Sequence, residues 1–141
     1  MKNLEFKLLE KKDYPLIVPM VAELNPSVSH ELLNERFQEM AGQGYECLVA
    51  VQEDEIVGVC GMWITTRLYC GKQIEVDNVV VSPSVRSQGL GKKLMQWVYD
   101  YANSIDCETV ELNTYITNSK SHKFYYNEGF ETLGLHMQKK L

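Results

Sequence analysis

The chain has 141 residues, 45% of them hydrophobic and 23% charged, so it can bury a core of the size that a single domain needs. We therefore expect one domain over residues 1–141. The net charge is −5 and no basic cluster stands out, which argues against a nucleic-acid partner, because phosphate neutralisation needs clustered Lys and Arg. A mild negative charge would suit a cationic substrate, although many soluble proteins carry one.

The cysteines and the apolar segments argue against a metal-binding, a secreted and a membrane-spanning protein. Cys47, Cys60, Cys70 and Cys107 form no C-x-x-C pair, and the three histidines show no ligand spacing, so no metal is expected. The N-terminus lacks an apolar signal segment, and the longest apolar run, 56–64, is too short to span a bilayer. We expect a soluble, cytoplasmic protein without a membrane partner.

The first segments predict a strand followed by two helices. Residues 4–8 alternate apolar and charged side chains, as in a strand with one buried face. Asp13 can cap the helix that follows, and Pro19 should kink or divide this helix because proline has no backbone donor. Ser29 is expected to cap a second helix that runs to about residue 41.

The middle of the chain predicts extended structure. The segments 45–52 and 56–67 flank the polar turn 53–55 and indicate an antiparallel hairpin. After a second turn, residues 73–81 form a long apolar strand that leads into a loop with two glycines.

The last third predicts a helix at 90–104, a strand at 107–115, a helix at 118–128 and a final strand at 130–139. The strand–helix–strand unit between 74 and 114 should be a right-handed parallel crossover. The expected fold is therefore α/β (α+β): a mixed, mostly antiparallel sheet with one central parallel crossover and helices on both faces. An exposed final strand would also allow a homodimer.

The loop Arg86-Ser87-Gln88-Gly89-Leu90-Gly91 joins the long strand to the strongest predicted helix. The first turn of a helix has unpaired N–H groups that attract phosphate, and glycine removes the Cβ that would hold a phosphate away. A helix entry that merely needs glycine geometry is the alternative. Lys93 rules out a P-loop, which needs Ser or Thr there, and Leu94 stands at the third glycine of a dinucleotide fingerprint.

In this setting the loop resembles a signature of the GNAT superfamily of N-acetyltransferases, as do the flanking Val79-Val80-Val81-Ser82-Pro83 and Lys92-Lys93-Leu94. A second segment, His122 to Phe130, is similar to the F-Y-x-x-x-G-F element of that family. The order of elements also matches, so the resemblance covers essentially the whole chain. It implies acetyl-CoA as cosubstrate and an amine as acceptor, and the chain looks most like small-amine members, including aminoalkylphosphonate acetyltransferases.

The resemblance also implies residues that hold the cofactor. The backbone amides of Val79 and Val81 would pair with the pantetheine arm. The amides that would surround the pyrophosphate are those of Ser87, Gln88, Gly89, Leu90, Gly91 and Lys92. The Arg86 and Lys92 side chains would add positive charge, or would simply be solvated. Asn118 matches a family asparagine that binds pantetheine, and it is equally a candidate N-cap for the next helix; the two roles can coexist.

Two catalytic residues are expected on this basis. Alternation places Glu75, Asp77, Val79 and Val81 on one strand face, with the carboxylates near the thioester. The resemblance implies that Glu75 is the base, directly or through water, while Asp77 would bind the substrate cation; otherwise both are solvated or paired with lysines. Tyr125 matches the tyrosine that protonates the departing thiolate, or else it is a core aromatic.

The leading hypothesis is acetyl transfer from acetyl-CoA to a primary amine of a small molecule, by direct attack in a ternary complex. Transfer to a peptide or protein amine, a non-catalytic acyl-CoA-binding module and an unrelated nucleotide-binding protein are the alternatives. Trp63, Tyr69 and Tyr14 are candidates for lining the acceptor pocket, and the loops 26–30 and 68–72 are expected to select the acceptor.

Overall fold

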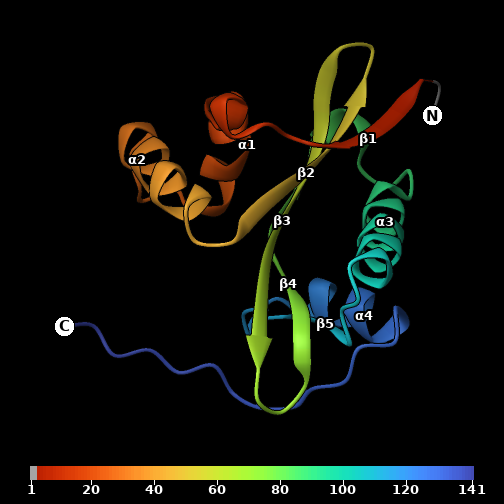
Figure 1. Ribbon diagram of the computed structural model, residues 1–141. Coiled ribbons are helices and arrows are strands. Elements are labelled where there is room, and N and C mark those ends of the chain that lie inside the picture. The colour runs from red at the N-terminus through yellow and green to blue at the C-terminus, as the bar shows by residue number, and fades with distance from the viewer. Residues whose placement is uncertain (1–2) are drawn as a thin grey trace.

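The computed structural model describes residues 3–141, and its centre is one five-stranded sheet (Figure 1). The strands follow one another in chain order across the sheet: β1 (Leu4–Leu8), β2 (Tyr45–Gln52), β3 (Glu55–Arg67), β4 (Gly71–Val81) and β5 (Thr109–Leu112). Neighbours are antiparallel except β4 and β5, which are parallel and joined by α3 (Leu90–Ser104). The predicted mixed sheet with one parallel crossover is confirmed.

Helices cover both faces of this sheet. The short α1 (Val18–Val21) and the longer α2 (His30–Ala41) lie on one side, and α3 and α4 (Ser119–Asn127) lie on the other (Figure 1). The α3 bounds match the prediction, and Ser29 caps α2 as expected, its hydroxyl accepting from the Leu32 amide at 3.1 Å.

The first predicted helix is broken into pieces. A 3-10 helix over Lys11–Ile17 precedes α1, and another over Ala22–Leu24 follows it. Pro15 and Pro19 lie four residues apart and each removes a backbone donor, so a continuous α-helix cannot form there. Asp13 lies inside the first piece, and no side chain caps that piece, so the predicted cap at Asp13 is wrong.

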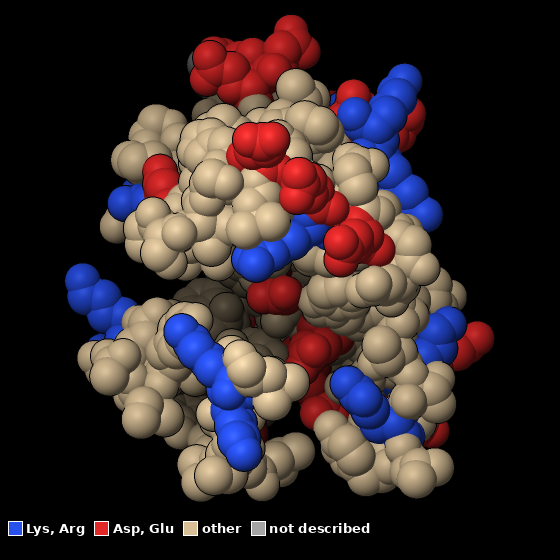
Figure 2. All heavy atoms as spheres, turned by 90° about the vertical axis from the view of Figure 1, so that its left-hand side faces the viewer, with Lys and Arg blue, Asp and Glu red and all other residues tan. Residues whose placement is uncertain are grey.

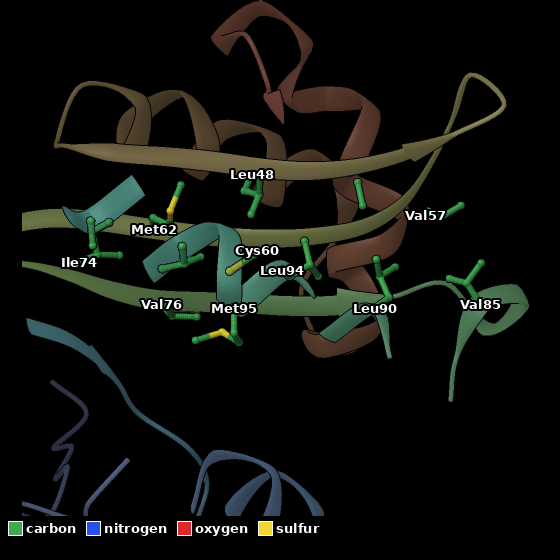
Figure 3. Packing of buried hydrophobic residues seen from close by; sticks show 13 residues of the cluster. Leu48, Val57, Cys60, Met62, Ile74, Val76, Val85, Leu90, Leu94 and Met95 are labelled. Carbon is green, nitrogen blue, oxygen red and sulfur yellow. The ribbon is translucent and has the colours of Figure 1, made fainter. Parts of the chain in front are cut away.

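Each face has its own apolar core. On the α3 side, Leu90, Leu94, Met95 and Val98 pack against strand residues such as Met62, as Figure 3 shows for most of them. On the α2 side, the core is aromatic. Its rings, Tyr14, Phe37 and Tyr45, stand with centroids 5.6 to 6.0 Å apart. Burying each such side chain contributes about 1.5–3 kcal/mol, so both helical layers are held firmly to the sheet.

A β-bulge interrupts β4 in its middle. Asp77 pairs with Gly61 and Val80 pairs with Val59, so two residues of β4, Asn78 and Val79, lie opposite the single residue Cys60. Asn78 has φ +53°, a conformation that asparagine tolerates better than most residues. The extra residue reverses the alternation of side chains beyond it.

The bulge corrects the expectation that four alternating residues of β4 share one face. Val79 and Val81 pack against the α3 core, whereas Asp77 accepts a hydrogen bond from Trp63, which packs against the α2 core. Glu75 and Asp77 precede the bulge and stay on the α2 face. The carboxylates and the valines therefore point to opposite sides of the sheet.

The C-terminal third contains less strand than predicted. β5 has four residues instead of nine because β4 pairs with it only over Gln73–Val76. The prediction of a final strand at 130–139 is wrong: this segment has no regular secondary structure and pairs with no strand of residues 3–141. Residues 131–141 are instead exposed and extend away from the sheet (Figure 1). A homodimer thus loses the exposed final strand on which its prediction depended.

Candidate functional site

The candidate site begins where β4 and β5 separate. β5 ends its pairing opposite Val76, while β4 continues to Val81 against β3. The edge of β4 that would face β5 therefore has no strand partner from Asp77 onward within residues 3–141. Peptide groups on such an edge are available to an extended ligand. Val79 and Val81, predicted to offer their amides to pantetheine, lie in this stretch.

The glycine loop has the unpaired amides that phosphate binding requires. The Arg86 amide bonds to the Pro83 carbonyl at 3.5 Å, and the Lys93 amide bonds to the Gly89 carbonyl at 3.2 Å. Between them, the six backbone amides from Ser87 to Lys92 have no acceptor within the described chain. The loop and the first turn of α3 thus present a run of unpaired backbone N–H groups at the positive end of this helix. The predicted amide cluster is present.

The side chains of this loop have different surroundings. Leu90 is buried in the α3 core, so only its backbone amide is available to a ligand. Arg86 donates to the Val81 carbonyl at 3.1 Å and pairs with Glu23 at 3.4 Å, which draws its charge toward the α1 side. Gln88 donates to the Ser84 carbonyl at 3.4 Å, and Lys92 is exposed on α3. Lys92 is therefore the cation of the loop without a partner among residues 3–141.

The two glycines of the loop occupy their positions for different structural reasons. Gly89 has φ +77° and serves as the N-cap of α3, where a side chain would strain the backbone. Gly91 is helical, and a Cβ there would meet Phe124 of α4 at an ordinary distance of 3.6 Å. Gly89 is thus needed for the turn, whereas Gly91 leaves the helix surface beside the free amides bare.

Glu75, the predicted base, lies beside the end of β5. Its Oε1 accepts a hydrogen bond at 3.1 Å from the amide of Asn113, the residue that follows β5. Glu75 is partly exposed, and across the strands it pairs with Trp63 on one side and Glu111 on the other. The carboxylate is therefore held near the point where the two strands separate, in contact with solvent.

Asp77 lines a cavity of about 280 Å³ between α2 and the sheet. Its Oδ2 accepts from the Trp63 indole at 3.0 Å, which fixes the carboxylate and leaves the other oxygen without a partner among residues 3–141. Arg36, Phe37 and Met40 of α2 form the opposite wall. Figure 2 shows a hollow on this side of the molecule with acidic side chains inside it.

Tyr125, the predicted acid, lies on the other face of the sheet. It comes from α4 and packs against the α3 core, with its ring 5.1 Å from Phe124 and 5.6 Å from Phe130. Burial, and secondarily the Cys60 thiol, raise the pKa of Tyr125 to about 12, so the phenol keeps its proton at neutral pH. Its hydroxyl has no hydrogen-bond partner within residues 3–141, which leaves it free to donate.

Asn118 caps α4, as one of its two predicted roles required. Its Oδ1 accepts from the Ser121 amide at 3.2 Å, and its side-chain nitrogen Nδ2 makes no bond within the described chain. His122 contacts the Tyr115 carbonyl at 2.8 Å and so helps to fix the start of this helix. The cap leaves the Asn118 amide available to a ligand, so the cofactor role remains a prediction.

Sequence reasoning missed three residues of this region. Asn113 orients Glu75, Asn78 makes the bulge, and Arg36 lines the same cavity as Asp77. None belongs to a recognisable motif, and Arg36 lies on a helix rather than on the loops expected to select the acceptor. Of the proposed lining aromatics, Trp63 does line the cavity, whereas Tyr14 is buried in the core and the exposed Tyr69 bonds to Glu111.

Over residues 3–141, no three His, Cys, Asp or Glu side chains converge as metal ligands would, and no helix has the length and apolar character needed to cross a bilayer.

Comparison with known proteins identifies the family of this chain. The model of the Acetyltransferase (GNAT) family matches residues 9–130. Aminoalkylphosphonate N-acetyltransferase of Salmonella typhimurium is 31% identical over 84 residues, which are 59% of this chain and 54% of that protein. Glucosamine 6-phosphate N-acetyltransferase of Arabidopsis thaliana is 29% identical over 119 residues, 80% of this chain and 78% of that protein. The match to the phosphonate enzyme thus spans only about half of its length.

Solved structures share the fold over nearly the whole chain. An acetyltransferase of Trypanosoma brucei superposes with a TM-score of 0.78 at 27% identity, covering 99% of this chain and 100% of that one. A ribosomal-protein-alanine N-acetyltransferase of Brucella melitensis reaches 0.82 at 18% identity, covering 98% and 99%. At that identity the likeness shows the fold alone, so the fold does not distinguish small acceptors from protein acceptors.

Proposed function

The chain belongs to the GNAT acetyltransferase family, and on that premise we propose that it transfers an acetyl group from acetyl-CoA to a primary amine of a small molecule, by direct attack in a ternary complex. The observation that carries this proposal is the arrangement at the fork of β4 and β5. Free amides and Tyr125 lie on its α3–α4 side, and two carboxylates lie on its α2 side. The acetyl donor and the amine acceptor can then approach β4 from opposite faces of the sheet.

The residues present fit acetyl-CoA, which when bound supplies an acetyl group activated as a thioester. The six free amides from Ser87 to Lys92 are donors for a pyrophosphate, and Lys92 adds a positive charge beside them. The unpaired edge of β4 at Val79 and Val81 offers peptide groups to the pantetheine amides, and Asn118 offers its free side-chain nitrogen. Arg86 stabilises the loop from behind through Val81 and Glu23.

Glu75 is proposed to take the proton that the acceptor must lose. An alkylammonium is mostly protonated at neutral pH, and only the neutral amine attacks a carbonyl. The ammonium therefore loses one proton before it attacks, and a second proton leaves the nitrogen as the new N–C bond forms and the C–S bond breaks. The Glu75 carboxylate, oriented by Asn113 and open to solvent, is proposed to receive the first proton directly or through a water, and the second passes to solvent. Asp77 would hold the ammonium group before it is deprotonated.

Tyr125 is proposed to supply the proton that the departing sulfur needs. Its pKa of about 12 keeps the phenol protonated, and the absence of a hydrogen-bond partner within residues 3–141 leaves that proton free to be donated. It lies on the face opposite Glu75, so the proton removed from nitrogen and the proton given to sulfur follow separate routes. A partly solvent-exposed carboxylate at Glu75 and a partly buried phenol at Tyr125 suit these two tasks.

The acceptor is proposed to be small because the cavity beside Asp77 is about 280 Å³ and is closed on one side by the aromatic core. The two curated relatives described above act, by their names, on an aminoalkylphosphonate and on glucosamine 6-phosphate, both small amines. These observations favour a small amine over a peptide or protein acceptor. A non-catalytic acyl-CoA-binding module would not need Glu75 and Tyr125 on opposite faces of the fork.

The test measures acetyl-CoA-dependent thiol release over a panel of amines, amino acids, aminophosphonates and polyamines. We expect turnover with at least one small amine and a loss of about 100-fold or more in kcat for Glu75→Gln, as for removal of a general base. Glu55→Gln, at the distant start of β3, is the matched control and should retain full activity. Calorimetry should show acetyl-CoA binding unchanged in both variants. A protein that binds acetyl-CoA yet acetylates only peptides, or nothing, contradicts the proposal.

A further inference from the structure

We infer that the acceptor is an amine that also carries an anionic group, and that Arg36 binds this group. The inference rests on the proposed function and goes beyond it by naming the chemical class of the acceptor. It starts from the charges inside the cavity between α2 and the sheet. Among the lining residues, Asp77 is the one acid and Arg36 the one base.

Arg36 is not engaged elsewhere. It lies on the exposed side of α2, and within residues 3–141 it makes no hydrogen bond and no ion pair, whereas Arg86 is tied to Glu23 and Val81. A guanidinium offers a planar set of five donors that matches a carboxylate or a phosphorus oxyanion in two-point contact. At the mouth of a cavity, such a group is available to a ligand rather than to the fold.

The Asp77 carboxylate is positioned to bind the ammonium group of such a ligand. The Trp63 indole fixes one of its oxygens at 3.0 Å, and Asp77 makes no ion pair with Arg36 or any other described residue. Phe37 and Met40 are apolar residues that line the same cavity. A ligand with an ammonium group, a short apolar spacer and an anionic group complements this set of lining groups.

The experiment compares acceptors that differ only in the anion: 2-aminoethylphosphonate, β-alanine and propylamine. With the wild-type chain, we expect kcat/KM for the two anionic acceptors to exceed that for propylamine by about tenfold or more, as a charge-assisted contact provides. Arg36→Gln should lower kcat/KM for 2-aminoethylphosphonate by about 10–100-fold and leave that for propylamine within about twofold. Arg36→Lys should restore part of the loss, and Arg67→Gln, at the far end of β3, is the control.

Calorimetric binding of 2-aminoethylphosphonate to the full chain separates this inference from the proposed function. If no amine is acetylated but the phosphonate binds and Arg36→Gln abolishes binding, the acetyl-transfer proposal fails and the anion site stands. If Arg36→Gln binds the phosphonate as well as the wild type does, or lowers kcat/KM for all three acceptors equally, the role of Arg36 is overturned. Turnover of propylamine at the rate of the anionic acceptors overturns it as well.

Discussion

The two faces of the sheet differ in what they offer a ligand, although the same strand contributes to both. Toward α3 and α4, β4 presents Val79 and Val81 beside a run of unpaired amides and an apolar core. Toward α2, it presents Asp77 at the cavity beneath α2 and Glu75 beside the end of β5, and Figure 2 shows acidic side chains in the hollow on this side. One face suits a long, anionic cofactor and the other a small, cationic acceptor. The difference arises from a single inserted residue.

The bulge at Asn78 is therefore the feature that divides the site. Without it, alternation would place carboxylates and valines on one face, and both ligands would approach from the same side. With it, Glu75 and Asp77 before the bulge lie on the acceptor face, whereas Val79 and Val81 after it lie on the cofactor face. A strand bulge thus lets two ligands meet at one strand without competing for space.

The largest expected effect removes the proton donor from the cofactor face. Tyr125→Phe should lower kcat by about 100-fold or more, the usual contribution of a general acid, and should leave the affinity for acetyl-CoA unchanged, because only the hydroxyl is lost. Tyr126→Phe is the matched control, since Tyr126 is exposed and bonds to Thr132 at 2.7 Å. Thiol-release kinetics and calorimetry measure the two quantities. A Tyr125→Phe enzyme within about twofold of wild type in kcat would remove this residue from the mechanism.

Next in size is the removal of the bulge conformation itself. Asn78→Val places a β-branched residue at φ +53° and should lower the free energy of unfolding by about 1–2 kcal/mol. Asn78→Gly accepts the same conformation and should remain close to wild type. Urea unfolding measures both. Equal stability of the valine variant and the wild type would show that the strand does not depend on this conformation.

Substitutions of the two loop glycines distinguish an effect on stability from an effect on acetyl-CoA binding. Gly89→Ala should cost about 1 kcal/mol of unfolding free energy, because φ is +77° there. Gly91→Ala has room for its methyl group, 3.6 Å from Phe124, so its stability should change little. It should nevertheless weaken acetyl-CoA binding by about tenfold, the loss of one charge-assisted contact. Thermal unfolding and calorimetry distinguish these effects, and equal changes in both variants would contradict the distinction.

The smallest effect lies far from either ligand. The β2–β3 turn has positive φ at both Glu53 and Asp54, as a two-residue type I′ hairpin requires. Asp54→Gly should stabilise the protein by about 0.5 kcal/mol without altering activity, because glycine adopts this conformation without strain. Urea unfolding at a fixed protein concentration measures the gain. A destabilised variant would mean that the lost conformational entropy of the unfolded chain outweighs the strain.

Local features of the sequence were sufficient to predict the helix ends, the glycine loop and the parallel crossover. The bounds of α3, the cap at Ser29 and the cap at Asn118 followed from short-range chemistry, since helix ends are fixed by residues a few positions apart. The loop from Arg86 to Gly91 was identified for the same reason, because its donors belong to consecutive residues. The parallel crossover around α3 followed from the strand–helix–strand order.

Only the tertiary structure decided what depends on partners distant in the chain. The register of β3 against β4 creates the bulge, so strict alternation misplaced Val79 and Val81. The fold of α2 over the sheet brings Arg36 and Asp77 to one cavity, and residues 131–141 pair with no strand of the described chain. Strand pairing and cavities are set by long-range packing, which no short segment encodes.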